Sequence, residues 1–342
     1  MRRQEQVWAA RNVRAIVSAG VVAGFLLGGP AAQAAVSFQF QYTDPAGTGF
    51  LDSTNGLSRQ AALNTAASTF SSIFASHFSN SGTVVLEATA RDDVTDDTLA
   101  SAGSKLMGAD AAGFNLGEVV RTKLQTGTDL NGNSPDGSVE INFGNLWELD
   151  FNAPVSSTRY DFYSTLFHEF THVLGFTSTI GQSGDPVFGT RNVGNWSAFD
   201  GFIVDKDGAR IIEPTNFALN QGAWDTGSIG GTSPFGGLFF DGVNTVAANG
   251  GNPVGLYTPT TWEEGSSVSH LDDENPALAG RMMLARSDTG PYARDYDAVE
   301  VAMLTDLGYT ATVVPEPHTY AMLLVGLGML VCIARRRRDA MG

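Results

Sequence analysis

His168, Glu169 and His172 form the stretch of this chain whose residue types and spacing most clearly suggest chemistry. On a helix, residues four apart lie one turn above each other on the same face, so both imidazoles can reach one metal ion. A carboxylate beside them can take a proton from a metal-activated water and pass it to a leaving amine. The chain has only five histidines, so a chance match is rare. The pattern predicts a catalytic zinc site for peptide hydrolysis.

A catalytic zinc ion needs a third protein ligand, and His270 is the best candidate. His77 lies in an expected amphipathic helix, and His318 lies beside an apolar segment near the C-terminus. The neighbourhood of His270 is small, polar and turn-like, and two methionines, Met282 and Met283, follow it. A carboxylate ligand is the alternative. The acidic residues that flank His270 are Glu263, Glu264, Asp272, Asp273 and Glu274.

The residues around the two helical histidines predict the element that positions them. Apolar residues recur at helical spacing through this stretch. They are Phe162, Leu166, Phe170 and Val173. Ser157 or Thr158 is expected to cap the start of the helix, and Gly175 is expected to end it.

With these residues the chain resembles the metzincin metalloproteases, whose active-site helix carries H-E-x-x-H-x-x-G and whose metal pocket is floored by a methionine turn. The matching positions are His168, Glu169, His172 and Gly175, with Met282 or Met283 as the turn methionine. Ser178 departs from the pattern, because it stands where the usual metzincin has its third histidine. His270, far downstream and shortly before the methionines, resembles the arrangement of the leishmanolysin-like branch.

The resemblance implies a mixed α/β or α+β fold with two subdomains, a twisted mixed sheet, an active-site helix and an irregular C-terminal subdomain. It also implies one zinc ion on His168, His172 and His270, where the metal lowers the pKa of a bound water. Glu169 then orients and deprotonates this water for attack on a peptide carbonyl. The many cysteines of eukaryotic members are absent, so the resemblance is limited to the zinc site.

Two further expectations follow from the resemblance. The strand over residues 138–143, just before the helix, would be the sheet edge that pairs with an extended substrate, and the alternative is an ordinary strand of the sheet. A tyrosine often assists the oxyanion at the second position after the turn methionine, but Leu284 and Ala285 stand there. Tyr292 and Tyr296 are the remaining candidates for this role.

The N-terminal end predicts export. Arginines precede an apolar run over residues 15–27, and Ala32-Gln33-Ala34 offers a small-residue cleavage site. The run has about 13 residues, fewer than the roughly 20 of a membrane-spanning helix. Residues 1–34 are therefore expected to be a signal peptide.

The C-terminal end resembles a PEP-CTERM sorting tail. Val314-Pro315-Glu316-Pro317 precedes an apolar run over residues 320–334, which Arg335–Arg338 stop. The resemblance implies processing by an exosortase-type membrane enzyme, with inner-membrane anchoring before that step. Afterwards the protein would lie in the cell envelope or the extracellular matrix, or be secreted. The expected domains are a signal peptide (1–34), an upper catalytic subdomain with the zinc helix (35–175), a lower catalytic subdomain with the third ligand and the methionine turn (176–313), and the tail with its transmembrane segment (314–342).

Charge and cysteine content narrow the function classes. The part between signal and tail keeps 12 basic and 33 acidic residues, so its net charge is near −21. Such a charge opposes binding to nucleic acid or to anionic membranes. The sole cysteine, Cys332, lies in the tail, so the exported part forms no internal disulfide. Residues 129–140 carry oxygen donors in part of a calcium-loop pattern but lack its sixth-position glycine, which makes a Ca²⁺ site a weak possibility beside a plain polar loop.

The remaining elements fit an α/β domain. Hydrophobic periodicity and turn residues predict strands over 36–42, 83–90 and 139–143, a helix over 58–78, a hairpin around 205–208, a glycine-rich insertion over 222–255 and a last helix over 297–307. The sequence thus favours an exported zinc endopeptidase that acts on protein or peptide substrates, with no nucleic-acid partner and with membrane contact only through its tail. The alternative is a cell-surface adhesion or matrix protein that keeps a metal-bound metzincin-like fold without turnover. A calcium-dependent glycan-binding module is a third, weaker possibility.

Overall fold

Residues 35–310 are described by the computed structural model, and the expected signal peptide and sorting tail lie outside them. The strands are β1 (Val36–Tyr42), β2 (Gly82–Arg91), β3 (Ala100–Ser104), β4 (Leu106–Met107), β5 (Gly117–Glu118), β6 (Gly137–Asn142), β7 (Trp147–Glu148), β8 (Tyr160–Asp161), β9 (Phe188–Thr190), β10 (Val193–Asn195), β11 (Ile203–Asp205), β12 (Leu238–Phe240) and β13 (Val254–Gly255). The α-helices are α1 (Gly56–Ile73), α2 (Val119–Thr126), α3 (Phe162–Val173), α4 (Gln221–Gly227), α5 (Val243–Ala248) and α6 (Ala298–Asp306). Short 3-10 helices cover Gly49–Leu51, Ala75–His77, Phe199–Phe202 and Pro276–Leu278.

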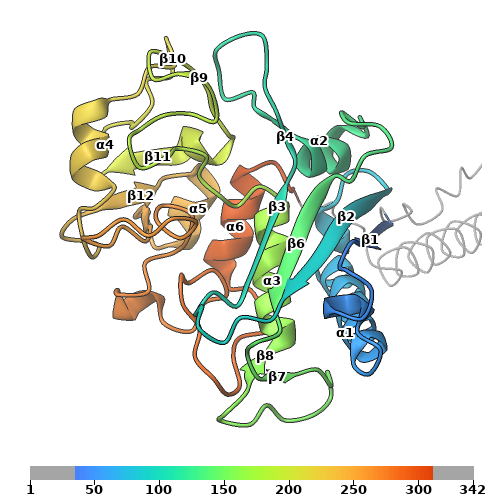
Figure 1. Cartoon of the computed structure of the whole chain (residues 1–342). Coiled ribbons are helices and arrows are strands. Elements are labelled where there is room, and N and C mark those ends of the chain that lie inside the picture. Colours follow the sequence, from blue (N-terminus) through green and yellow to red (C-terminus); the bar gives the residue numbers. More distant parts are fainter. Residues whose placement is uncertain (1–34, 311–342) are drawn as a thin grey trace, which may run out of the picture. The chain divides into compact units, whose positions relative to one another are not determined.

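A mixed four-stranded sheet supports the helix that carries the two spaced histidines (Figure 1). Its strand order is β1-β2-β6-β3, with the first three strands parallel and β3 antiparallel to β6. Side chains alternate between the faces of β1, so Phe38 and Phe40 turn toward the helices while Gln39 is exposed. The mixed α/β class predicted from the sequence is confirmed, and its metzincin form remains a prediction.

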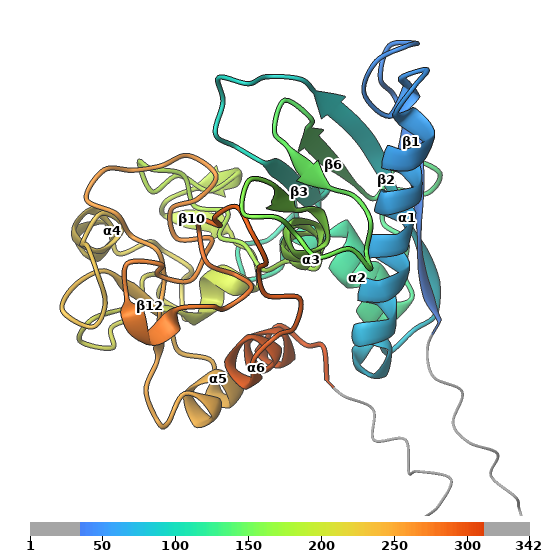
Figure 2. The same cartoon turned by 90° about the horizontal axis from the view of Figure 1, so that it is seen from below.

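Aromatic packing fixes α3 against the sheet and α1. The Phe170 ring stacks on Phe38 with centroids 5.1 Å apart and meets Phe70 of α1 at 5.4 Å. The apolar positions that predicted α3 are fully buried. Figure 2 shows α1 and α3 beside the sheet, with the shorter elements of the second half on the other side of α3. Burial of this apolar stripe, rather than helix propensity, fixes the orientation of α3.

The ends of α3 agree only partly with the prediction. Asp161 caps the start, because its carboxylate accepts hydrogen bonds from the backbone N–H groups of Tyr163 and Ser164. The predicted caps Ser157 and Thr158 were wrong, since they lie several residues before the helix begins. Gly175 ends the helix as predicted, with a φ of 98° that favours glycine.

The predicted substrate edge of the sheet was wrong. The strand expected over residues 138–143 is β6, and it lies between β2 and β3 rather than at an edge. The edge strand is β3, whose sequence Ala-Ser-Ala-Gly-Ser has little strand propensity. Pairing with β6 makes this segment a strand, and periodicity carries no signal for such pairing.

The second half of the described chain, residues 176–310, is built from short elements, as its glycine-rich composition predicts. β11 pairs with β12, which pairs with β13. The expected turn at residues 205–208 forms, with Gly208 N donating to Asp205 O. The first arm of the expected hairpin is not a continuous strand, because Phe199–Phe202 is a 3-10 helix. The two arms pair through a single β-bridge, between Val204 and Arg210.

The last helix joins both halves. α6 begins at a capping box of Asp297 and Glu300 and ends before Gly308, as predicted. Just beyond it, Tyr309 is buried and its hydroxyl donates to Leu174 O at the end of α3 over 2.9 Å. The end of the described chain therefore stabilises the C-terminus of α3.

The weak calcium-loop signal over residues 129–140 has another explanation. Lys123 Nζ lies 2.9 Å from Asp129 and 2.7 Å from Asp136. Glu140, the twelfth position of the motif, pairs instead with Arg91 on the sheet. A lysine ammonium thus neutralises Asp129, the first-position carboxylate that a calcium ion would need.

We expect Gly175→Ala to destabilise the fold more than an ordinary glycine substitution does. A Cβ at Gly175 would overlap Glu118 Oε1, a buried atom, and would also disfavour the positive φ. Gly208, with a φ of 82° and no atom within 4 Å of the place that a Cβ would take, is the matched control for backbone strain alone. Denaturant unfolding should show a loss of about 3 kcal/mol for Gly175→Ala and about 1 kcal/mol for Gly208→Ala. Equal losses would contradict a role for the Glu118 contact.

Candidate metal centre

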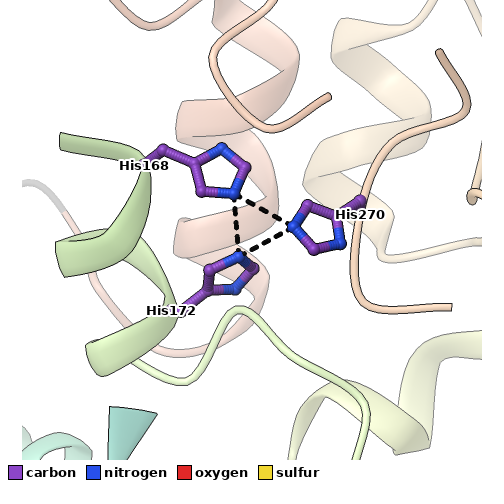
Figure 3. Close-up of side chains that lie close together, drawn as sticks. All are labelled: His168, His172 and His270. Atoms are coloured by element: carbon purple, nitrogen blue, oxygen red, sulfur yellow. Dashed lines mark hydrogen bonds between the residues drawn. The ribbon is translucent and has the colours of Figure 1, made fainter. Parts of the chain in front are cut away.

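Two elements bring the three predicted histidines together. His168 and His172 lie one turn apart on α3, and His270 comes from the irregular segment that follows β13 (Figure 3). Their Nε2 atoms form a triangle in which every side is 3.0 Å. Within residues 35–310 this is the group of histidine and acidic side chains that could hold a metal ion.

Backbone carbonyls fix which nitrogen of each ring carries the proton. His168 Nδ1 lies 2.8 Å from Met282 O, His172 Nδ1 lies 2.6 Å from Phe176 O, and His270 Nδ1 lies 2.9 Å from Ser266 O. A carbonyl oxygen only accepts hydrogen bonds, so each Nδ1–H must donate. In a neutral imidazole the other nitrogen, Nε2, then carries a lone pair.

The dashed lines of Figure 3 join the three Nε2 atoms. With each Nδ1 donating to a carbonyl, the lone pairs of these three atoms face one another across 3.0 Å. Protonation of a ring does not relieve this repulsion easily. Burial lowers the pKa of His168 to about 4 and of His270 to about 3, and it lowers the pKa of His172 well below its ordinary value. A cation among the three nitrogens is the remaining way to stabilise the arrangement.

The triangle has the size of a metal site. Corners of a triangle with 3.0 Å sides lie about 1.7 Å from its centre. Zinc–nitrogen bonds are about 2.0–2.1 Å, so His168, His172 and His270 could together hold one zinc ion and would leave a fourth ligand position for water. The donor set and its carbonyl partners thus fit a metal ion held by imidazoles.

The acidic alternatives to His270 lie outside the cluster. Each has another partner in the structure. Glu263 and Asp273 pair with Arg286, Glu264 accepts from Trp262 Nε1, Asp272 accepts from Ser233, and Glu274 accepts from Thr232. These contacts occupy the five carboxylates that sequence reasoning left open.

Glu169 lies beside the cluster and is 6% exposed. Burial raises the pKa of its carboxyl to about 8, and a hydrogen bond from the backbone of Ala102 opposes this rise. A cation on the neighbouring imidazoles would favour the charged carboxylate. Glu169 is therefore a buried acid–base group next to a candidate metal centre.

The centre opens into a cavity of about 700 Å³. Its walls come from both halves of the molecule and include all three histidines and Glu169. One wall is the run from Asp97 to Ala102, which contains the start of edge strand β3. Further walls are Glu263–Ser266 and Leu284–Ser287. An extended chain has room to lie between β3 and these segments.

The methionine pair contacts the site on one side, and its role as a methionine turn remains a prediction. Met282 lines the cavity, and its carbonyl accepts from His168. Met283 is fully buried, and its backbone N–H donates to Glu300 Oε1 of α6 over 2.7 Å. The α6 carboxylate thereby fixes the turn that orients the first histidine.

The two candidate tyrosines differ in position. Tyr296 is outside the cavity lining, and its hydroxyl lies 2.8 Å from Thr171 Oγ1 and from Phe167 O on α3. Tyr292 lines the cavity, and its hydroxyl donates to Arg286 O over 3.1 Å. Tyr292 is thus the candidate whose position allows contact with a molecule in the cavity.

The C-terminal tail is the part of the chain that a known family explains. Residues 313–338 match the family model of the PEP-CTERM protein-sorting motif, which confirms the predicted tail. The motif indicates export, processing by exosortase and exosortase-dependent sorting to the cell surface. The chain matches no curated protein and no solved structure. Among residues 35–310, no helix combines the length and hydropathy that a membrane crossing requires.

Sequence reasoning missed the groups that orient the histidines. Three of them are backbone carbonyls, of Phe176, Ser266 and Met282, and residue type carries no signal for their positions. Asp161 had a usable signal, because an aspartate directly before the apolar run is a preferred helix cap. Glu300 also had a sequence signal, because it completes a capping box with Asp297. Its contact with the methionine turn depends on the fold and had no such signal.

We expect the protein to bind one zinc ion with a strong dependence on His270. Loss of a ligand should weaken binding by more than the about 10–100-fold that outer contacts contribute. Competition with a chromophoric chelator should show this loss for His270→Ala. His77→Ala is the control, since His77 lies outside the cluster.

The same titration tests the alternative ligands. Glu263→Gln and Asp272→Asn should bind zinc as the unchanged protein does. Zinc at a concentration about 1,000 times its Kd should add about 4 kcal/mol to the free energy of unfolding. Full affinity in His270→Ala, or its loss in a carboxylate variant, would contradict the three-histidine assignment.

Proposed function

We propose that this protein is an exported zinc-dependent endopeptidase. The observation that carries the proposal is a buried glutamate, Glu169, beside three imidazoles whose lone pairs converge in one cavity. The sorting motif supports a site of action outside the cytoplasm. The metzincin-like fold, with subdomains divided at Gly175, is part of this proposal.

The donor set supports zinc as the metal. Imidazole nitrogens suit zinc, whereas calcium and magnesium prefer oxygen ligands. Three protein ligands with an open fourth position are typical of catalytic rather than structural zinc sites. Bound there, zinc would polarise a carbonyl and lower the pKa of a water molecule.

Glu169 supplies the acid–base step. Its carboxylate accepts the proton of the attacking water and returns it to the amine that leaves when the peptide bond breaks. The contact with the Ala102 backbone holds this carboxylate between the edge strand and the histidines. The same carboxylate therefore lies where a peptide on β3 would present its scissile bond.

The outer edge of β3 supports a peptide as the substrate. Leu99 O accepts from Asn142 N, and Lys105 N donates to Asp136 O, so the backbone groups of Leu99 and Lys105 point toward β6 and the residue before it. Because backbone groups alternate in direction along a strand, those of Ala100 and Ala102 point the other way, toward the cavity. The Ala102 N–H already donates to Glu169, so an extended peptide can pair with the backbone groups of Ala100 and with the Ala102 carbonyl, with little demand on its sequence.

We expect purified exported protein to cleave denatured casein and Glu169→Gln to lose this activity while keeping its zinc. Loss of a general base costs about 10²–10⁴-fold in rate. Cleavage assays with bound zinc measured in parallel separate chemistry from metal binding. Glu213→Gln, an exposed glutamate outside the cavity, is the matched control. A zinc-loaded parent that cleaves nothing would favour the adhesion or matrix protein instead.

We also expect pairing with β3 to show in a scan of N-methylated peptide substrates. N-methylation removes one backbone donor without changing a side chain. Because paired residues alternate along a strand, kcat/KM should fall at every second position near the cleaved bond. A flat profile would contradict binding along the sheet edge.

A further inference from the structure

A buried carboxylate, Asp200, lies close to the centre without an ion-pair partner among residues 35–310. It is 1% exposed. It accepts hydrogen bonds from Ser178 Oγ and Thr179 Oγ1, both at 2.7 Å, and from Ser197 N at 3.1 Å. Burying a charge without a cation is costly, so these donors are what stabilises it.

The donors belong to the segment that leaves α3. Directly after Gly175, this segment turns its side chains at Ser178 and Thr179 toward Asp200. Its other contacts point to the third histidine. Ser178 N and Thr177 Oγ1 both donate to Ser269 Oγ, over 3.2 and 3.1 Å, and Ser269 is the neighbour of His270.

His270 needs such support more than the helical pair does. The geometry of α3 fixes His168 and His172, but His270 stands on an irregular segment. Two residues earlier, Val268 has a φ of 66°, which is unfavourable for a β-branched residue. The local chain therefore does not prefer this path, and contacts from elsewhere must hold it.

We propose that Ser269, supported by Asp200 through the 177–179 segment, is a positioning residue that docks His270 into the metal centre. Ser269 is 6% exposed, and its hydroxyl oxygen is the atom on which both donors converge. The connection links the third ligand to the chain that continues directly from the helix carrying the other two. The proposal rests on the metal centre of the proposed function and is independent of proteolysis.

Ser178, the departure from the metzincin pattern, takes part in this connection. Ser178 holds the position at which the usual metzincin pattern has a histidine. Here its side chain turns to Asp200 and its backbone N–H turns to Ser269. Ser178, which supplies no ligand, thus contacts the direct neighbour of His270.

The test measures metal affinity and coordination in the exported protein. Ser269→Ala and Asp200→Asn should weaken zinc binding by about 10–100-fold in chelator competition. Co²⁺-loaded samples should show a weaker visible absorption, because a loosened third histidine leaves a higher-coordinate, water-rich ion. Ser269→Thr keeps the hydroxyl and should restore both readouts. If Ser269→Ala does not fold, Thr177→Val removes one of the two donors to Ser269 and gives the same test.

Asp44→Asn is the matched control. Asp44 is also buried and accepts backbone N–H bonds, from Phe50 at 2.7 Å and from Ala90 at 2.8 Å, and neither donor belongs to the 177–179 segment or to the segment of His270. Its zinc affinity should equal that of the parent. Unchanged affinity in Ser269→Ala and Asp200→Asn, or an equal loss in Asp44→Asn, would overturn the positioning role. A parent that binds no metal would instead overturn the metal centre itself.

Discussion

Three imidazole nitrogens that present lone pairs to one another over 3.0 Å repel each other unless a cation lies among them. The rest of the site depends on this constraint. Three backbone carbonyls orient the rings so that the lone pairs converge, and burial disfavours their protonation. Without a metal ion, the repulsion between the three rings would favour their separation.

The carbonyls that orient the rings come from separate parts of the domain, so the geometry of the centre depends on the whole fold. Phe176 O follows the glycine that ends α3, and the buried Tyr309 stabilises that helix end. Met282 O lies in the turn that Glu300 of α6 holds. Ser266 O belongs to the same irregular segment as His270. Loss of any of these supports should therefore act on metal affinity as well as on folding.

The sequence predicted the parts of the site that depend on residue type and local spacing. His168, Glu169 and His172 follow helical spacing, and the choice of His270 follows from the small number of histidines. The edge strand could not be predicted in the same way, because β3 has a weak strand pattern and gains its structure from pairing with β6. The roles of Ser269 and Asp200 likewise depend on contacts between residues distant in the chain.

In an exported protein, a metal ion bound at this centre would have a second role, in stability. Cys332, the only cysteine, lies in the tail, so disulfides cannot stabilise the described residues in an oxidising environment. A metal shared by His172 and His270 joins positions 98 residues apart. By the loop-closure argument used for disulfides, a cross-link over about 100 residues contributes up to about 5 kcal/mol by restricting the unfolded chain. That is comparable with the whole stability of many domains, about 5–15 kcal/mol. The ion that would activate the water therefore also connects the two halves whose walls form the cavity, so activity and folding would fail together when it is removed.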